Sequence, residues 1–216
     1  MSEAARVHPY ASLTPDLVLD ALDAVGIRGD GRLIALGSYE NRVYQAMLDD
    51  GPPVVAKFYR PLRWSDAQIA EEHAFVRALA AAEVPSVPPR EIEGRTLHVH
   101  EGFRFAVYDK CGGRAPELDR DDVLEWLGRF LGRLHAVGAT ARFGTRPALD
   151  LETFGVAPRR FLLDGGFLPD DLREAWTAAS GLALDGAARA FGRAGHVATL
   201  RLHGDVHPGN VLWIDA

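Results

Sequence analysis

The stretch that decides how this chain folds is His203–Asn210, with the sequence HGDVHPGN. Short apolar runs at 200–202 and 211–214 lie on its two sides, and such runs are typical of buried strands. Asp205 and Asn210 are five positions apart, and the Pro-Gly pair between them favours a tight turn. We therefore predict a loop between two strands, with both polar side chains facing one site.

That spacing matches the chemistry of phosphoryl transfer. The reaction needs a carboxylate to accept the proton of the acceptor hydroxyl, and oxygen ligands to hold Mg²⁺ on the phosphates. In a kinase catalytic loop the base Asp precedes the metal-binding Asn by five positions. The pattern thus predicts Asp205 as the catalytic base and Asn210 as the metal ligand. An isolated pair of this kind is usually a polar loop with a capping Asp, but the flanking residues favour the catalytic interpretation.

The same stretch also allows a different metal site. His203, Asp205 and His207 alternate along the chain, and side chains at alternate positions of an extended segment can converge on zinc. The sequence contains no second His, Cys or Asp cluster to complete the coordination, and this interpretation leaves Asn210 without a role. Zinc is therefore the weaker hypothesis.

A lysine in an apolar strand is the second signal. Lys57 lies within the run VVAKF at 54–58, where a charge is costly unless it is paired. The next helix offers Glu71 and Glu72 as partners, and we prefer Glu72 because its spacing from the apolar positions that follow turns it toward the sheet. The pair is typical of the kinase lysine that touches the ATP phosphates. The alternative is an exposed lysine on an edge strand.

Two further segments are weaker signals. The turn at 37–41 could place backbone N–H groups and the Ser38 hydroxyl on phosphates, although it is also an ordinary hairpin turn. The Arg-rich segment 60–64 is either solvated surface or a contact for an acidic or phosphorylated partner, and nothing in the sequence decides between them. His135 is interpreted as structural.

The remaining pattern predicts an α+β protein in two lobes. A capping box of Ser65 and Gln68 begins one of its helices. A nucleotide-binding lobe at 1–110 precedes a partial catalytic lobe at 111–216, and a cleft between lobes is a favoured ligand site. Strands are expected at 33–36, 41–48, 54–59, 95–100 and 103–108, helices at 15–25, 65–82 and 123–137, and a loop with one or two helices, such as 170–179, at 140–198.

Composition excludes several classes of protein. The net charge is −6, from 24 Lys and Arg against 30 Asp and Glu, which disfavours a general nucleic-acid-binding surface. Cys111 is the only cysteine, so no intrachain disulfide can form, as expected for a protein of the reducing cytosol. The sequence has neither an apolar run of the roughly 18 residues that span a membrane nor a signal-peptide core.

The motif HGDxHxGN at 203–210 resembles the catalytic-loop signature of the aminoglycoside phosphotransferase and choline-kinase-like superfamily. Within it, five segments resemble bacterial serine/threonine protein kinases of the stress-response type. The whole resemblance, with the loop motif included, extends from about residue 38 to residue 213. The five segments are 38–45, 57–64, 71–73, 102–107 and 200–205.

The resemblance implies the protein-kinase-like fold and an enzyme of the bacterial cytoplasm that uses ATP and Mg²⁺. It implies that the acceptor is a Ser or Thr hydroxyl of a protein and that the enzyme acts in envelope and oxidative stress. We expect no nucleic-acid or membrane partner, and a monomer at full length. The implied roles are proton acceptor for Asp205, Mg²⁺ ligand for Asn210, and ATP contacts for Ser38 and for Lys57 with its partner Glu72. Adenine contacts are implied for the backbone of the hinge residues Tyr108, Asp109, Lys110 and Cys111.

One departure from the family concerns the second metal ligand. Such kinases carry a metal-binding Asp on the strand after the catalytic loop, whereas this chain ends six residues past Asn210. Asp215 is the one acidic residue there, and its position in a turn gives no reason to assign it the role. We therefore expect a truncated kinase that is inactive by itself. The alternatives are a kinase for an aminoglycoside, choline or sugar, and a nucleotide-binding pseudokinase that acts through partners.

Overall fold

A computed structural model describes residues 8–214 of the chain. The chain forms two compact units, one comprising Met1–Gly144 with Leu200–Ala216 and the other Thr145–Thr199. The predicted lobes, 1–110 and 111–216, were defined by their expected roles, nucleotide binding and catalysis, whereas these units are defined by their compactness. The division into lobes therefore stays a prediction. The predicted site residues, from Ser38 to Asn210, all belong to the first unit.

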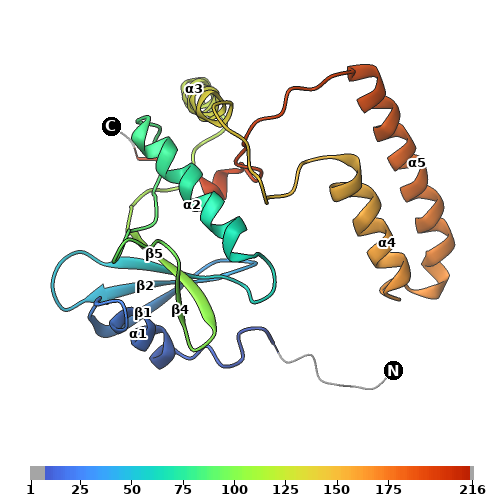
Figure 1. Ribbon diagram of the computed structural model, residues 1–216. Helices are drawn as coiled ribbons and strands as arrows, with labels where there is room; N and C mark the ends of the chain where they lie inside the picture. Colours follow the sequence, from blue (N-terminus) through green and yellow to red (C-terminus); the bar gives the residue numbers. More distant parts are fainter. Residues whose placement is uncertain (1–7, 215–216) are drawn as a thin grey trace. The chain divides into compact units, whose positions relative to one another are not determined.

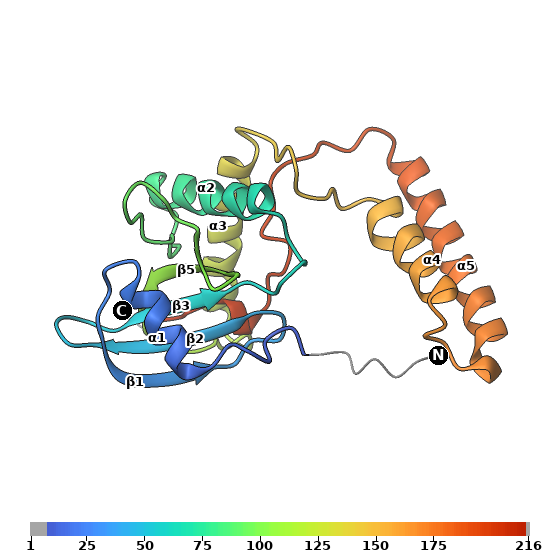
Figure 2. The same ribbon diagram turned by 60° about the horizontal axis from the view of Figure 1, so that its bottom comes forward.

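The first unit contains a five-stranded antiparallel sheet with the strand order β1-β2-β3-β5-β4 (Figure 2). Each strand overlaps a predicted one, which confirms the sequence pattern. The chain turns between β2 and β3 at Gly51, whose φ of 94° is a conformation that glycine adopts readily. The strands are β1 (Gly29–Leu36), β2 (Arg42–Leu48), β3 (Val54–Phe58), β4 (His98–His100) and β5 (Phe103–Asp109).

Alternation along β3 sends its side chains to two different environments. Val54, Ala56 and Phe58 are fully buried and pack in the main core with helix α1 (Pro15–Asp23). Val55 and Lys57 point to the opposite face, where helix α2 (Asp66–Ala81) lies (Figure 1). The sheet thus packs a mainly apolar core on one face and uses the other to hold a charged side chain under a helix.

Helix α2 begins and packs as its sequence predicts. The Ser65 hydroxyl accepts from the N–H of Gln68 at 3.2 Å, and the Gln68 side chain accepts from the N–H of Ser65 at 2.9 Å. Ile69 packs on the sheet face, whereas Phe75 and Leu79 pack against helix α3 (Asp121–Gly138). The helix is therefore anchored on two sides, to the sheet and to α3.

The expected strands around the 203–210 loop were a wrong prediction. Within residues 8–214, the segment 211–214 makes one isolated bridge, between Trp213 and Arg114, and 200–202 joins no strand. The N–H of Arg201 instead donates to the carbonyl of Gly138 at the end of α3, at 3.2 Å. A strand needs a neighbouring row of free backbone groups. Here the N–H of Arg201 bonds the end of helix α3 instead of a neighbouring strand.

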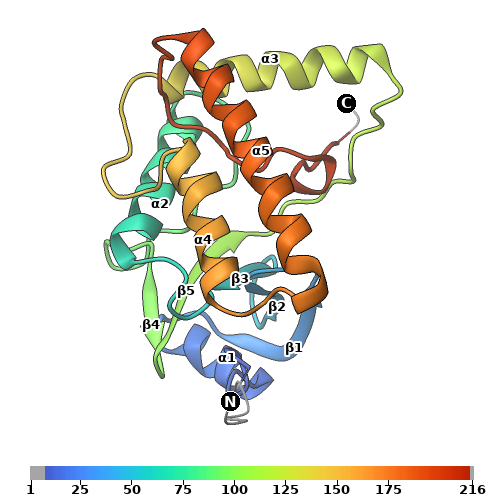
Figure 3. The ribbon, with the colours of Figure 1, turned by 90° about the vertical axis from the view of Figure 1, so that its right-hand side faces the viewer.

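The second unit, Thr145–Thr199, is helical, as expected, but its last helix is longer than the predicted 170–179. A π-helical turn η1 (Glu152–Val156) leads into α4 (Ala157–Asp164), and α4 packs antiparallel to α5 (Asp170–Ala194) (Figure 3). The Arg159 side chain joins the two helices through the Ser180 hydroxyl at 2.9 Å and the Thr177 carbonyl at 3.0 Å. No helix within residues 8–214 is long and apolar enough to cross a membrane.

Candidate active site

Lys57 forms an ion pair with Glu72 across the seam between β3 and α2. Its Nζ lies 3.0 Å from the Glu72 Oε1, and the two side chains are 24% and 28% exposed. Strand β3 pairs with β2 on one side and β5 on the other, so the alternative of an edge-strand lysine is wrong. A partly buried ammonium in the middle of a sheet needs such a partner.

The two neighbouring glutamates of α2 have different partners. The Glu71 Oε1 accepts from the backbone N–H of Gly144 at 2.7 Å, while Glu72 faces the sheet. Consecutive helical residues point about 100° apart, because an α-helix has 3.6 residues per turn. The structure thus pairs Lys57 with Glu72, the residue that the helical spacing favoured.

The loop at 203–210 brings Asp205 and Asn210 together. The Asn210 Nδ2 donates to the backbone carbonyl of Asp205 at 2.8 Å and to its Oδ2 at 3.1 Å. A short 3₁₀ turn, η2 (Pro208–Asn210), returns the chain to make these contacts. With Nδ2 turned toward Asp205, the amide oxygen of Asn210 lies on the other side of its side chain, where it can act as an oxygen ligand.

Both histidines of the loop accept hydrogen bonds from backbone N–H groups of the same loop. The His207 Nδ1 accepts from the N–H of Gly209 at 3.1 Å, and the His203 Nδ1 accepts from the N–H of Asp205 at 3.3 Å. An accepting Nδ1 places the proton of a neutral ring on Nε2. The His207 Nε2 faces the Asp205 Oδ2 at 3.7 Å, which is too long for a hydrogen bond.

These contacts restrict how the loop histidines could bind zinc. Each loop histidine already uses one ring nitrogen as a backbone acceptor, so a metal could take only its Nε2. Across residues 8–214, no group of three His, Cys, Asp or Glu side chains is arranged to hold a metal ion.

A cavity of about 440 Å³ joins the charged pair to the loop. Its volume lies within the range of about 300–1,000 Å³ that small-molecule sites have. The lining combines two opposite charges, an amide and a phenol with a row of aliphatic side chains, as a site for a polar ligand with a flat apolar portion requires. The lining residues are Val43, Val55, Lys57, Glu72, His73, Val76, Val87, Tyr108, Asn210 and Leu212.

Only some of the predicted site residues line this cavity. Lys57, Glu72, Tyr108 and Asn210 line it, whereas the others do not. Asp205 lies beside it through its bonds to Asn210, and its side chain is 78% exposed. The predicted residues outside the lining are Ser38, Asp109, Lys110, Cys111 and Asp205.

Ser38 is half-buried in the loop between β1 and β2, and the neighbouring Glu40 holds this loop in place. The Glu40 carboxylate accepts from the Trp64 Nε1 at 2.8 Å and the Arg63 Nε at 2.9 Å. Burial acts to raise the pKa of Glu40, but the hydrogen bonds from Arg63 and Trp64 outweigh it and hold that pKa below its usual value. The Arg-rich segment therefore supplies an internal clamp for the predicted phosphate loop.

The hinge residues differ in where their side chains go. The Tyr108 hydroxyl lies 3.1 Å from the Tyr59 hydroxyl, and burial raises the pKa of Tyr108. The Asp109 carboxylate accepts from the Arg90 Nε at 2.7 Å, and the Lys110 Nζ donates to the carbonyl of Cys111 at 2.7 Å. The side chains of Asp109 and Lys110 thus stay outside the cavity, and the adenine contacts assigned to this hinge stay a prediction.

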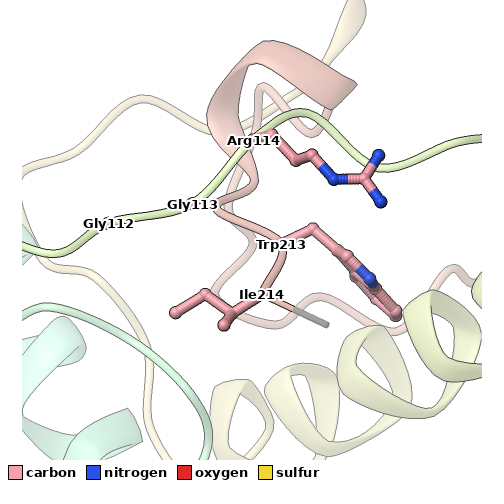
Figure 4. A pocket seen from close by; sticks show the side chains of 5 residues that line it. All are labelled: Gly112, Gly113, Arg114, Trp213 and Ile214. Atoms are coloured by element: carbon pink, nitrogen blue, oxygen red, sulfur yellow. The ribbon is translucent and has the colours of Figure 1, made fainter. Parts of the chain in front are cut away.

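A second hollow of about 290 Å³ lies where the linker after the hinge meets the end of the described chain. Gly112, Gly113, Arg114, Trp213 and Ile214 line it, and the side chains of Arg114 and Trp213 point to the same side (Figure 4). Its one charged lining residue, Arg114, pairs with Glu117, which lies outside the lining, so this hollow has no group to which a catalytic role is assigned. Asp215, which the sequence left unassigned, lies outside the described residues.

That linker also shapes the first cavity. Gly113 has a φ of 142°, and a Cβ on it would come within 2.9 Å of the Leu212 Cβ. Only glycine allows this approach, and it places Leu212 in the cavity lining.

Several lining residues were not predicted, namely the aliphatic ones and His73. Alternation along β3 puts Val55 on the same face as Lys57, so that residue could have been found from the sequence. Val43 lies opposite Lys57 in the ladder, which depends on the pairing register. Val87 and Leu212 come from loops, whose positions no local pattern predicts.

Comparison with known proteins points to the same residues. The model of the Phosphotransferase enzyme family matches residues 31–215, a range that includes the Lys57–Glu72 pair and the 203–210 loop. The chain belongs to this family. The superfamily resemblance seen in the loop motif is thereby confirmed.

The chain is also similar to curated bacterial proteins. It is 42% identical over 206 residues to stress response kinase A of Salmonella choleraesuis (strain SC-B67) and 44% identical over 206 residues to that of Escherichia coli (strain K12). A relative named serine/threonine protein kinase RdoA, from Salmonella typhimurium, is 41% identical. Each match covers 95% of this chain and 62% of the relative, so the chain spans less than two thirds of their length.

Solved structures confirm the kinase-like α+β fold of this family. The amicoumacin kinase hAmiN matches with a TM-score of 0.66 at 18% identity, over 92% of this chain and 60% of that one. Spectinomycin phosphotransferase matches with a TM-score of 0.63 at 15% identity, over 93% and 65%. At these identities the likeness concerns the fold alone.

Proposed function

We propose that this chain carries the nucleotide site and catalytic loop of an ATP-dependent phosphotransferase, most closely a bacterial serine/threonine protein kinase of the stress-response type. One observation carries the proposal: a single cavity is lined by the Lys57–Glu72 ion pair and by Asn210, which bonds Asp205. A fixed cation, an oxygen ligand and a carboxylate beside one cavity are the groups that phosphoryl transfer requires.

The residues present fit ATP and Mg²⁺. In this proposal the Lys57 ammonium binds the phosphates, and Glu72 holds that ammonium in position. The aliphatic side chains Val43 and Val55 receive the flat base, with the backbone of the hinge 108–111 beside it. The amide oxygen of Asn210 is a metal ligand. Bound Mg²⁺ supplies neutralisation of the negative charge that develops on the phosphates.

Asp205 acts on the acceptor. Its exposed carboxylate takes the proton of the acceptor hydroxyl, while Asn210 holds one of its oxygens through Nδ2. Two features fix the backbone just before Asp205. Gly204 has a φ of 83°, and the Asp205 N–H donates to the His203 ring. Loss of a general base is worth roughly 10²–10⁴ in rate.

The acceptor is proposed to be a protein Ser or Thr hydroxyl. The name of the 41% identical relative, serine/threonine protein kinase RdoA, supports this choice. The name stress response kinase A supports a role in stress, and a place in the cytoplasm is proposed with it. A small-molecule hydroxyl is the second candidate, because two neighbours of this fold are named for acting on amicoumacin and spectinomycin. The relative whose name specifies a protein kinase is much closer in sequence, at 41% identity, than these neighbours at 18% and 15%.

The test is phosphoryl transfer from γ-labelled ATP by the full-length protein, with a generic protein acceptor and with an aminoglycoside, choline and a sugar. Label on protein Ser or Thr, lost in Asp205→Asn with ATP affinity retained, supports the proposal. Label on a small molecule alone would select the second candidate. ATP binding without any transfer would favour a pseudokinase. The inactivity expected of the 216-residue chain stays a prediction, and the same assay on that chain tests it.

A further inference from the structure

A chain of buried and partly buried hydrogen bonds lies next to the Lys57–Glu72 pair. His73 is buried, with 2% of its surface exposed. Its Nε2 lies 2.7 Å from the Tyr59 hydroxyl and its Nδ1 lies 2.8 Å from the Thr96 hydroxyl. The Tyr59 hydroxyl also lies 3.1 Å from that of Tyr108. The chain thus links α2, the end of β3, β5 and the segment before β4.

The network and the ion pair belong to one stripe of α2. Ile69, Glu72, His73 and Val76 are spaced i, i+3, i+4 and i+7, the spacing of a single helical face. Ile69 packs on Tyr59 and Ala106, and the other three line the cavity. Glu72 and His73 thus make the polar contacts of this face, with Lys57 and Tyr59, and both contacts depend on the rotation of the helix.

Tyr59 connects the two polar contacts. Its ring centroid lies 4.7 Å from the Lys57 Nζ, a cation–π distance, while its hydroxyl bonds His73. Lys57 and Tyr59 are two positions apart and share one face of the sheet. A movement of α2 that takes Glu72 away from Lys57 would therefore also break the bond between His73 and Tyr59.

We infer that Tyr59 and His73 are positioning residues, which hold α2 so that Glu72 keeps the Lys57 ammonium aimed into the cavity. This inference rests on the proposed function for the role of that ammonium. Tyr59 is outside the cavity lining, so it acts through Lys57 and the helix rather than by contact with a ligand. Buried polar networks of this kind specify one arrangement of packed elements.

The experiment measures binding of ATP with Mg²⁺, and separately of adenosine, to the 216-residue chain. Tyr59→Phe removes the hydroxyl and keeps the ring. We expect it to weaken ATP binding about two- to tenfold, the equivalent of one hydrogen bond, and to leave adenosine binding unchanged. In a Lys57→Ala background it should have no further effect on ATP. Weaker adenosine binding, or an equal loss of ATP affinity in both backgrounds, would overturn the inference.

Two additions keep the test decisive. Thr96→Val, which removes the hydroxyl bonded to the His73 Nδ1 and lies outside the cavity lining, should reproduce the ATP-specific loss. Leu79→Ala, a cavity-forming change on the α3 side of α2, should instead lower stability and spare ATP binding. Equal losses of ATP affinity in both variants would show that the network only stabilises the fold, and would overturn the inference. A double-mutant cycle on unfolding, with Tyr59→Phe and Glu72→Gln, needs no nucleotide. Coupled changes support the inference even if the wild type binds no ATP, and additive changes contradict it.

Discussion

The guanidinium carbon of Arg201 lies 4.6 Å from the centre of the Phe75 ring. This contact joins α2 to the segment that enters the 203–210 loop, two residues before His203. The same guanidinium donates to the Val137 carbonyl at 3.0 Å and to the Thr140 hydroxyl at 3.2 Å. Arg201 therefore ties the start of the loop to two helices.

Replacing Arg201 should loosen the loop. We expect Arg201→Ala to lower the free energy of unfolding by about 1–3 kcal/mol, because hydrogen bonds to a charged group are lost, and to speed amide hydrogen exchange across 203–210. Arg201→Lys should recover only part of this, since lysine lacks the planar fork. Exchange in the loop as slow as in the wild type would contradict the role of Arg201.

Gly138 allows the loop segment to approach α3. A Cβ on this buried glycine would overlap the carbonyl oxygen of Arg201. We expect Gly138→Ala to destabilise the protein by about 1–3 kcal/mol, the usual cost of overpacking. Gly132→Ala on the same helix is the matched control, because its Cβ would meet nothing within 4 Å. That change should stabilise by up to about 1 kcal/mol through helix propensity, so chemical denaturation of the two variants should give opposite signs.

Lys57→Ala should weaken binding of ATP with Mg²⁺ by about 1.5–3 kcal/mol, the range for a charge-assisted hydrogen bond. Isothermal titration calorimetry on the 216-residue chain measures this change. Arg77→Ala removes the same charge from the exposed side of α2, where Arg77 pairs with Glu91 at 2.7 Å. It should leave ATP affinity unchanged. Equal affinity of the wild type and Lys57→Ala would remove Lys57 from the site.

The clamp at Glu40 should make stability depend on acidic pH. Its pKa is held below the ordinary value of 4.5 in the folded protein, so its contribution is fully present above about pH 4.5 and is lost as the pH falls through the lower folded pKa. The free energy of unfolding between pH 6 and pH 3 should therefore fall more steeply in the wild type than in Glu40→Gln. Parallel pH profiles would show that the clamp does not couple to folding.

Local patterns were sufficient for much of this fold. The capping box at Ser65 and the apolar spacing in α2 depend on residues within a few positions of each other, and so does the alternation along β3. Each prediction from them was confirmed because a helix end or a strand face is determined by nearby atoms. The preference for Glu72 over Glu71 had the same origin, since helical phase decides which of two neighbours faces the sheet.

Other features depended on contacts between distant parts of the chain. The runs at 200–202 and 211–214 have the composition of strands, yet backbone groups of Gly138 and Arg114 decide what they pair with. The contact between Asp205 and Asn210 could be predicted from their spacing, because both residues lie within one loop. The cavity that joins Asn210 to Lys57 could not be, because 153 positions separate them and only the packing of α2, α3 and the loop brings them together.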